Sequence, residues 1–196
     1  MVLGFVDEVQ AAFDEMGRLA ARPWVMLSAG AGKADKAADL RARAFDAAPA
    51  ASGMANGQTF EWIADADMRL GPVLEVIVNG RYFWLPFAQI GGLEIEPPTD
   101  LRDAVWTAAT LRLVNGGEVV ALIPTRYAGT TESGDAAAKL ARATTWTDAG
   151  AETFVGTGQR LLATDEGDIP IMDLRLLTVN GAAGTEAEPG DAALDG

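Results

Sequence analysis

Two Asn-Gly dipeptides, each between apolar stretches, constrain the fold of this chain more than any other feature of its sequence. In "VLEVIVNGRYFWLP", residues 73–86, Asn79 and Gly80 separate two runs rich in β-branched and aromatic residues. Both residues tolerate the positive φ angles of a type I′ turn, so this segment predicts a hairpin of two antiparallel strands. A second hairpin is predicted at "TLRLVNGGEVVALIP", residues 110–124, where an additional glycine suggests a longer or bulged turn.

The rest of the chain after Phe60 continues this pattern. The stretch "GGLEIEPPTDLRD", residues 91–103, predicts a strand that ends at the two prolines. Residues 135–146, "DAAAKLARATTW", have a helical composition, and residues 159–179 supply one or two last strands. We therefore expect residues 56–180 to form a mainly antiparallel α+β domain with hairpins and one or two helices.

The first 55 residues have a different period and predict a helical N-terminal segment. Between Gly4 and the helix-terminating Pro23, apolar side chains recur at helical spacing. A second amphipathic helix is predicted between Lys33 and Pro49. At the other end of the chain, residues 181–196 are small and acidic, and we expect them to be a disordered tail.

Charge and composition exclude several classes of partner and chemistry. The formal net charge of −13 would repel a phosphate backbone, so nucleic acid is not an expected partner. No long apolar span or leader indicates a membrane association, so we expect a cytoplasmic protein. The chain has neither histidine nor cysteine, which excludes thiol chemistry and a His/Cys zinc site. No cofactor is expected, because "SAGAGKAD" departs from the phosphate-loop pattern at Leu27 and Ala34.

Carboxylates are the only dense group of potentially reactive side chains. Asp65, Asp67 and Glu75 lie within "FEWIADADMRLGPVLE". Paired acids could serve a carboxylate-based hydrolase or a metal-dependent enzyme, which is the alternative function that we keep open. The favoured interpretation is a turn in which the two aspartates pair with Arg69.

Large aromatic and arginine residues in the second half of the chain also have two interpretations. Trp62, Trp84, Trp106 and Trp146 could line a pocket, but in a domain of this size we expect them in the core. Arg126, Tyr127 and Arg160 could contact a partner, or could be scaffold residues that tie loops to aspartates or backbone carbonyls.

An ordered series of sequence blocks resembles the ImpE family, also called SciE or TagJ, of bacterial type VI secretion accessory proteins. The blocks are "FEWIADADMRLGPVLEVIVNGRYFWLPF", "IEPPTDLRDAVW", "NGGEVVALIPTRY", "TTW" and "GTGQRLLATDEGDIPIMDLR". The resemblance extends over roughly residues 34–178.

The resemblance implies a non-enzymatic protein that binds the small sheath subunit TssB and whose function is linked to that of the sheath-recycling ATPase ClpV. It also implies a tetratricopeptide-like helical region before the α+β domain, of which residues 1–55 would be a short remnant. Within the matched blocks, Trp84, Arg126, Tyr127 and Arg160 are the candidate partner-binding residues, because they lie at predicted strand ends or loops. No catalytic residue is assigned.

Overall fold

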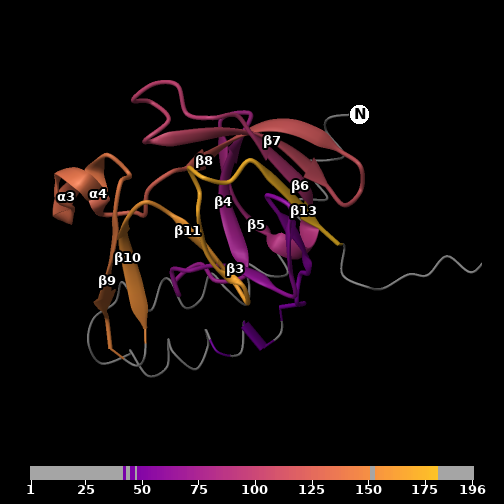
Figure 1. Cartoon of the computed structure of the whole chain (residues 1–196), viewed down its shortest axis with the longest axis horizontal. Helices are drawn as coiled ribbons and strands as arrows, with labels where there is room; N and C mark the ends of the chain where they lie inside the picture. The colour runs from indigo at the N-terminus through magenta and orange to yellow at the C-terminus, as the bar shows by residue number, and fades with distance from the viewer. Residues whose placement is uncertain (1–41, 43–44, 47, 151–152, 181–196) are drawn as a thin grey trace, which may run out of the picture.

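The computed structural model describes residues 42, 45–46, 48–150 and 153–180 (Figure 1). Within these ranges, all strand pairs are antiparallel and form three sheets. The main sheet has eight strands in the spatial order β2 (Gln58–Phe60), β1 (Gly53–Ala55), β13 (Leu176–Val179), β6 (Ile90–Ile95), β7 (Trp106–Leu113), β8 (Glu118–Pro124), β4 (Val73–Val78) and β5 (Arg81–Pro86). The smaller sheets are β12 (Gly167–Pro170), β11 (Leu161–Thr164) and β3 (Ile63–Asp65), and the pair β10 (Phe154–Gly158) and β9 (Thr144–Asp148). The short helical elements are η1 (Phe87–Gln89), α3 (Thr130–Ser133) and α4 (Ala136–Lys139).

Both predicted hairpins are confirmed. Asn79 and Gly80 adopt φ angles of 51° and 74° between β4 and β5. Gly116 adopts a φ angle of 83° in the four-residue connection 114–117 between β7 and β8. A mostly antiparallel sheet with short helices agrees with the α+β prediction. Residues 1–41 of the predicted N-terminal helical segment and the tail predicted at 181–196 lie outside the described residues. Within the helix predicted between Lys33 and Pro49, the described residues Ala42, Phe45 and Asp46 have helical backbone.

Three element predictions differ from the structure. The helix predicted at 135–146 extends only from Ala136 to Lys139, because Ala141 has a left-handed φ angle of 53° and the following threonines join β9. Residues 159–179 form three strands instead of one or two, since Gly167, with a φ angle of 126°, allows a hairpin between β11 and β12. The main sheet begins at Gly53, before the predicted boundary at residue 56.

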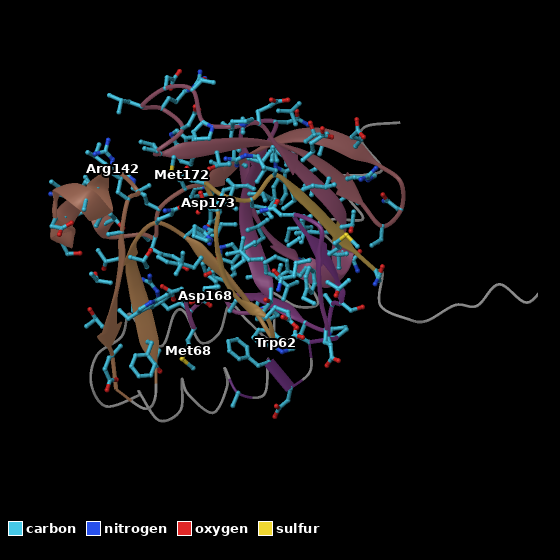
Figure 2. The ribbon with its side chains drawn as sticks, viewed as in Figure 1. Trp62, Met68, Arg142, Asp168, Met172 and Asp173 are labelled. Carbon is cyan, nitrogen blue, oxygen red and sulfur yellow. The ribbon has the colours of Figure 1, made fainter. Side chains whose placement is uncertain are left out.

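One hydrophobic core joins the main sheet to the three-stranded sheet. Alternate side chains of β7 are buried, as expected for a sheet with one packed face. Side chains fill the interior of the molecule (Figure 2). Leu162 of β11 is fully buried and belongs to the same core cluster as the main-sheet residues. The core includes Leu74, Val76, Leu85, Phe87, Ile90, Leu93, Leu111, Ile123, Leu162, Ile171, Leu174 and Leu177. In the part of the chain that the structure describes, no helix has the length and apolarity needed to cross a bilayer.

Candidate functional site

The main sheet is split between β4 and β8, and this split positions the candidate site. Only Ile77 and Val78 of β4 pair in register with β8. The residues of β4 before Ile77 diverge from β8, so the backbone groups that face each other across this split need other hydrogen-bond partners. Arg160 supplies one of them, because its Nε donates to the carbonyl oxygen of Pro124 at 2.9 Å.

Arg160 lies in the connection between β10 and β11, and its backbone is fixed on both sides. Its amide donates to the carbonyl of Thr125 at 2.8 Å, and its carbonyl accepts the amide of Ile171 at 3.0 Å. The preceding Gly158 has a φ angle of 111°, and a Cβ at this position would lie 2.0 Å from the carbonyl oxygen of Ala143. Glycine is therefore required where the chain turns to bring Arg160 into the split.

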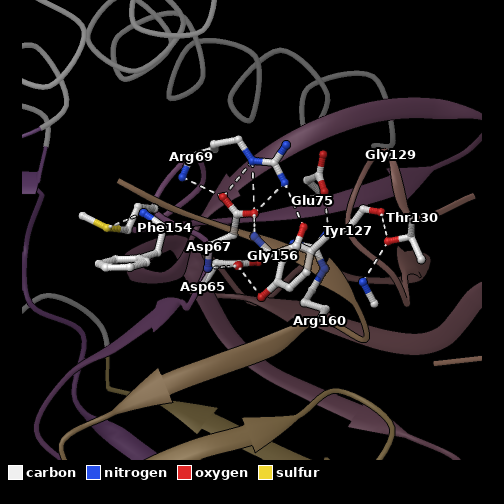
Figure 3. A network of polar contacts seen from close by, with 12 residues as sticks. Asp65, Asp67, Arg69, Glu75, Tyr127, Gly129, Thr130, Phe154, Gly156 and Arg160 are labelled. Atoms are coloured by element: carbon white, nitrogen blue, oxygen red, sulfur yellow. Dashed lines mark hydrogen bonds and ion pairs between the residues drawn. The ribbon is translucent and has the colours of Figure 1, made fainter. Parts of the chain in front are cut away.

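The guanidinium of Arg160 joins two carboxylates in the protein interior (Figure 3). It forms ion pairs with Asp65 of β3 and Glu75 of β4, and it lies 5.3 Å from the centre of the Tyr127 ring. The Arg160 side chain is fully buried. Burial alone would lower the pKa of Arg160, but the charges of Asp65 and Glu75 hold it above its ordinary value. Arg160 is consequently a permanent buried cation.

Asp65 is a buried acid with hydrogen-bond donors at both of its carboxylate oxygens. Its Oδ1 accepts the Tyr127 hydroxyl at 3.0 Å and the Asp67 amide at 2.9 Å, while its Oδ2 faces Arg160. Burial raises the pKa of Asp65 to about 6, although the charge of Arg160 and the hydrogen bonds act in the opposite direction. Tyr127 accepts the Leu161 amide at 3.0 Å, so its hydroxyl links Asp65 to β11.

Asp67 forms a second ion pair next to the first. Its two oxygens accept the Nε and NH2 groups of Arg69 at distances of 2.8 and 2.5 Å. They also accept the amides of Arg69 and Gly156, each at 2.8 Å. This pairing confirms the predicted turn for Asp67 and Arg69, whereas Asp65 pairs with Arg160 instead of Arg69.

A chain of hydrogen bonds connects the buried arginine to the protein surface through Glu75. The Tyr82 hydroxyl donates to Glu75 Oε1, and it accepts the Trp84 indole N–H at 2.6 Å. Burial and the neighbouring Glu75 raise the pKa of Tyr82, which therefore stays protonated. Tyr82 is nevertheless 53% exposed, so Arg160 and Glu75 hold an exposed aromatic side chain in a fixed position.

The arrangement favours a structural role for the three carboxylates. Every carboxylate oxygen of Asp65, Asp67 and Glu75 accepts at least one hydrogen bond from an arginine, an amide or a tyrosine. Among the residues that the structure describes, no group of three or more Asp or Glu side chains has a geometry that could hold a metal ion. Two surface hollows, with volumes of about 90 and 180 Å³, are lined by other residues.

The four candidate partner-binding residues occupy different environments. Tyr127 and Arg160 are buried, so any effect on a partner must act through the residues that they position. Arg126 donates to the Lys139 carbonyl and forms a bridge with Gln159, which ties the loop before α3 to the β10–β11 connection. Trp84 is half-buried and packs against the cluster of Leu70, Val73 and Tyr127. Their role in partner binding stays a prediction.

The prediction that the tryptophans lie in the core is wrong for three of them. Trp62, Trp106 and Trp146 are 42, 36 and 39% exposed. Sequence reasoning also missed Tyr82, although the register of the predicted hairpin could have located it next to Glu75 and Trp84. The Asn-Gly turn sets Glu75 opposite Trp84 and Ile77 opposite Tyr82. That register places the three polar groups on the same face of the hairpin.

Comparisons with known proteins find a family model, a sequence relative and a solved structure that resemble this chain. The family model described as ImpE protein matches residues 57–178. The chain is 55% identical over 146 residues to the type VI secretion system accessory component TagJ of Pseudomonas aeruginosa. That match covers 74% of this chain and 50% of the relative, so the chain spans about half the length of TagJ. A crystal structure of protein VPA1032 from Vibrio parahaemolyticus is 27% identical with a TM-score of 0.76, covering 85% of this chain and 62% of that one.

Proposed function

Because the chain belongs to the ImpE family, we propose that it is an accessory protein of a bacterial type VI secretion system. The observation that carries this proposal is the 55% identity to TagJ, which extends over 146 residues. The family model matches residues 57–178, which include Asp65, Glu75 and Arg160, so the resemblance is not confined to a short motif.

In this role the protein binds the small sheath subunit TssB and assists sheath assembly or the recycling of the sheath by ClpV. The protein acts as a binding module in the cytoplasm. The hydrogen bonds of Asp65, Asp67 and Glu75 support binding instead of catalysis, because all of their carboxylate oxygens already accept hydrogen bonds within the protein. A carboxylate-based hydrolase would have to release at least one of these acids from its arginine to act on a substrate.

Co-purification tests this function. The full chain and TssB from the same cell are expressed together, with the chain tagged, and the retained TssB is quantified. We expect retention of TssB at micromolar concentrations. Its absence, together with a failure to retain any other sheath or recycling component, would contradict the proposed function.

A further inference from the structure

The pair of strands β9 and β10 has a strand, β9, at its outer side that is paired on one edge alone. Within the described part of the chain, β9 pairs only with β10, in a register that sets Trp146 opposite Gly156. Figure 1 shows β9 at the outer margin of the molecule, with β10 on its inner side. Four of the five residues of β9 are exposed, namely Thr145, Trp146, Thr147 and Asp148.

The inner edge of β10 is occupied by other segments of the same chain. The amide of Gly156 donates to a carboxylate oxygen of Asp67 at 2.8 Å, and the carbonyl of Phe154 accepts the next amide after Asp67 at 3.3 Å. The carbonyl of Gly158 accepts the amide of Tyr127 at 2.9 Å. The backbone groups of residues 154, 156 and 158 therefore point away from β9.

The alternation of the backbone identifies the groups that β9 directs outwards. Successive residues of an antiparallel strand bond to opposite sides. Since residues 154, 156 and 158 bond inwards, the two residues of β10 between them bond to β9, where the register sets them opposite Thr147 and Thr145. The amides and carbonyls of Thr144, Trp146 and Asp148 consequently face away from β10. We call these outward-facing backbone groups the open edge.

The open edge lacks the features that usually keep strands from pairing with other chains. The sequence of β9, TTWTD, is rich in β-branched and aromatic residues, and its one charged residue is the last. Neither proline, lysine nor glycine interrupts it. By contrast β5, at one edge of the main sheet, begins with Arg81 and ends with Pro86. The open edge is therefore suited to accept a further strand.

The strand that carries the open edge is fixed in position by its own side chains. A Cβ at Gly156 would lie 2.4 Å from the ring of Tyr127 and 3.0 Å from the ring of Trp146, so glycine allows both rings to close over β10. The centres of these two rings are 5.8 Å apart. A strand that is already ordered loses little conformational entropy when it pairs.

A second copy of β9 matches the open edge in register. When two copies lie antiparallel with Trp146 opposite Trp146, the outward groups of one copy meet the outward groups of the other. The same register sets Thr145 of one copy opposite Thr147 of the other. Threonine pairs of this kind stabilise antiparallel strands.

Charge favours the same arrangement. Arg142 is exposed and lies just before β9. In the antiparallel register Asp148 of one copy is diagonal to Arg142 of the other, within reach of a long side chain, and the two-fold symmetry repeats this contact at the other end. A parallel alignment would instead set the two Asp148 side chains next to each other. The net charge of −13 on each copy opposes association, but at about 0.15 M salt charges more than about 8 Å apart are largely screened.

We propose that β9 is a dimerisation edge, which pairs antiparallel with β9 of a second copy of this chain to form one sheet of four strands. Stable complexes bury about 1,200–2,000 Å² in total, and a pair of five-residue strands buries less, so the dimer is weak and reversible. This inference does not depend on the proposed function.

Disulfide trapping tests the register directly, because the full chain contains no cysteine. Thr145→Cys and Thr147→Cys are prepared separately, one of them tagged, then mixed and mildly oxidised. In the proposed register the two positions face each other with Cα atoms about 4.5 Å apart, which a disulfide can bridge. Two copies of the same variant would place their cysteines out of register, beyond about 7 Å.

We expect the mixture to form a disulfide-linked dimer of one tagged and one untagged chain. Each variant alone should give at least tenfold less dimer. Equal cross-linking in the mixture and in the single variants would indicate random collision and overturn the inference. The absence of cross-linking would overturn it as well, and this is the result expected if residues 1–41 of the same chain cover the open edge.

Charge reversal separates this register from an effect of net charge, with the dimer dissociation constant measured by analytical ultracentrifugation from micromolar to millimolar concentrations. Arg142→Asp and Asp148→Arg should each weaken the dimer at least threefold, and the double variant should restore it to within twofold. The matched control Glu118→Arg changes the net charge as Asp148→Arg does, at an exposed position on β8, and should not weaken the dimer. A dimer strengthened by Asp148→Arg, or a chain that stays monomeric at millimolar concentration, would overturn the inference, whatever the outcome of the co-purification with TssB.

Discussion

Replacement of Arg160 by methionine tests the central element of the site, because it removes the buried cation and keeps most of the side-chain volume. The variant leaves Asp65 and Glu75 without their ion-pair partner, and it leaves the Pro124 carbonyl without the donor at 2.9 Å. Removing one partner of a buried ion pair typically costs about 3–5 kcal/mol of folding free energy. We therefore expect Arg160→Met to lower the free energy of unfolding at pH 7 by about 3–5 kcal/mol.

The loss of unfolding free energy in Arg160→Met should depend on pH, and the protonation of Asp65 determines whether this loss grows or shrinks as the pH falls. The folded-state pKa of this acid, about 6, lies above the unfolded value, so proton binding favours the folded state, and this contribution is lost as the pH rises through 6. Without the Arg160 cation the folded-state pKa of Asp65 rises further. Lowering the pH from 7 to 5 should then reduce the cost of Arg160→Met by about 1 kcal/mol.

Urea unfolding followed by tryptophan fluorescence measures both effects, and two further variants control them. Adding Asp65→Asn to Arg160→Met should recover part of the lost free energy, since a neutral amide can still accept the Tyr127 hydroxyl. Arg102→Met removes an exposed ion pair whose side chains are 74 and 54% accessible, so it should change the free energy of unfolding by no more than about 0.5 kcal/mol. A cost below about 1 kcal/mol for Arg160→Met, or a cost that grows as the pH falls, would refute the reasoning.

Three other substitutions test separate features, each by the same urea titration. Gly158→Ala should lower the free energy of unfolding by about 2–5 kcal/mol, because it adds left-handed strain and a clash with the Ala143 carbonyl. Gly129→Ala is the control: a Cβ there would meet nothing within 4 Å, so only the strain remains and the loss should be about 1–2 kcal/mol. Equal losses in the two variants would contradict the clash. Tyr82→Phe should cost about 1 kcal/mol, because Glu75 loses its donor, and no loss would indicate that the Glu75 link is unimportant for stability. Asp135→Ala should cost about 1 kcal/mol by removing the N-cap of α4, and an unchanged midpoint would mean that this helix adds nothing to stability.

The hairpins could be predicted from the sequence because their signal is local. Asn79 and Gly80 need no distant partner to adopt positive φ angles, and their register follows from the turn. The helix at 135–146 was overestimated because alanine content favours a helix. In the structure the left-handed backbone of Ala141 ends the helix, and the chain continues into β9.

The site could be predicted only in part. Asp67 and Arg69 are two residues apart, and a local turn was expected to join them. Asp65 and Glu75 are separated from Arg160 by 95 and 85 residues, and nothing local indicates that they meet. The exposure of Trp106 was missed for a similar reason: which side chains of β7 are exposed depends on the register between β7 and β8, which only the assembled sheet defines.

The position of β13 has a consequence for how the chain folds during its synthesis. This last strand lies between β1 and β6, so it pairs with residues translated more than 80 positions earlier. Until Leu176–Val179 leaves the ribosome, β1 and β6 each present an unpaired edge, which is the kind of edge that other nascent chains can join. Long-range pairing of this type also closes slowly. The vulnerable period for aggregation therefore lasts at least until Leu176–Val179 has been synthesised, when this four-residue strand joins β1 to β6 in the middle of the sheet.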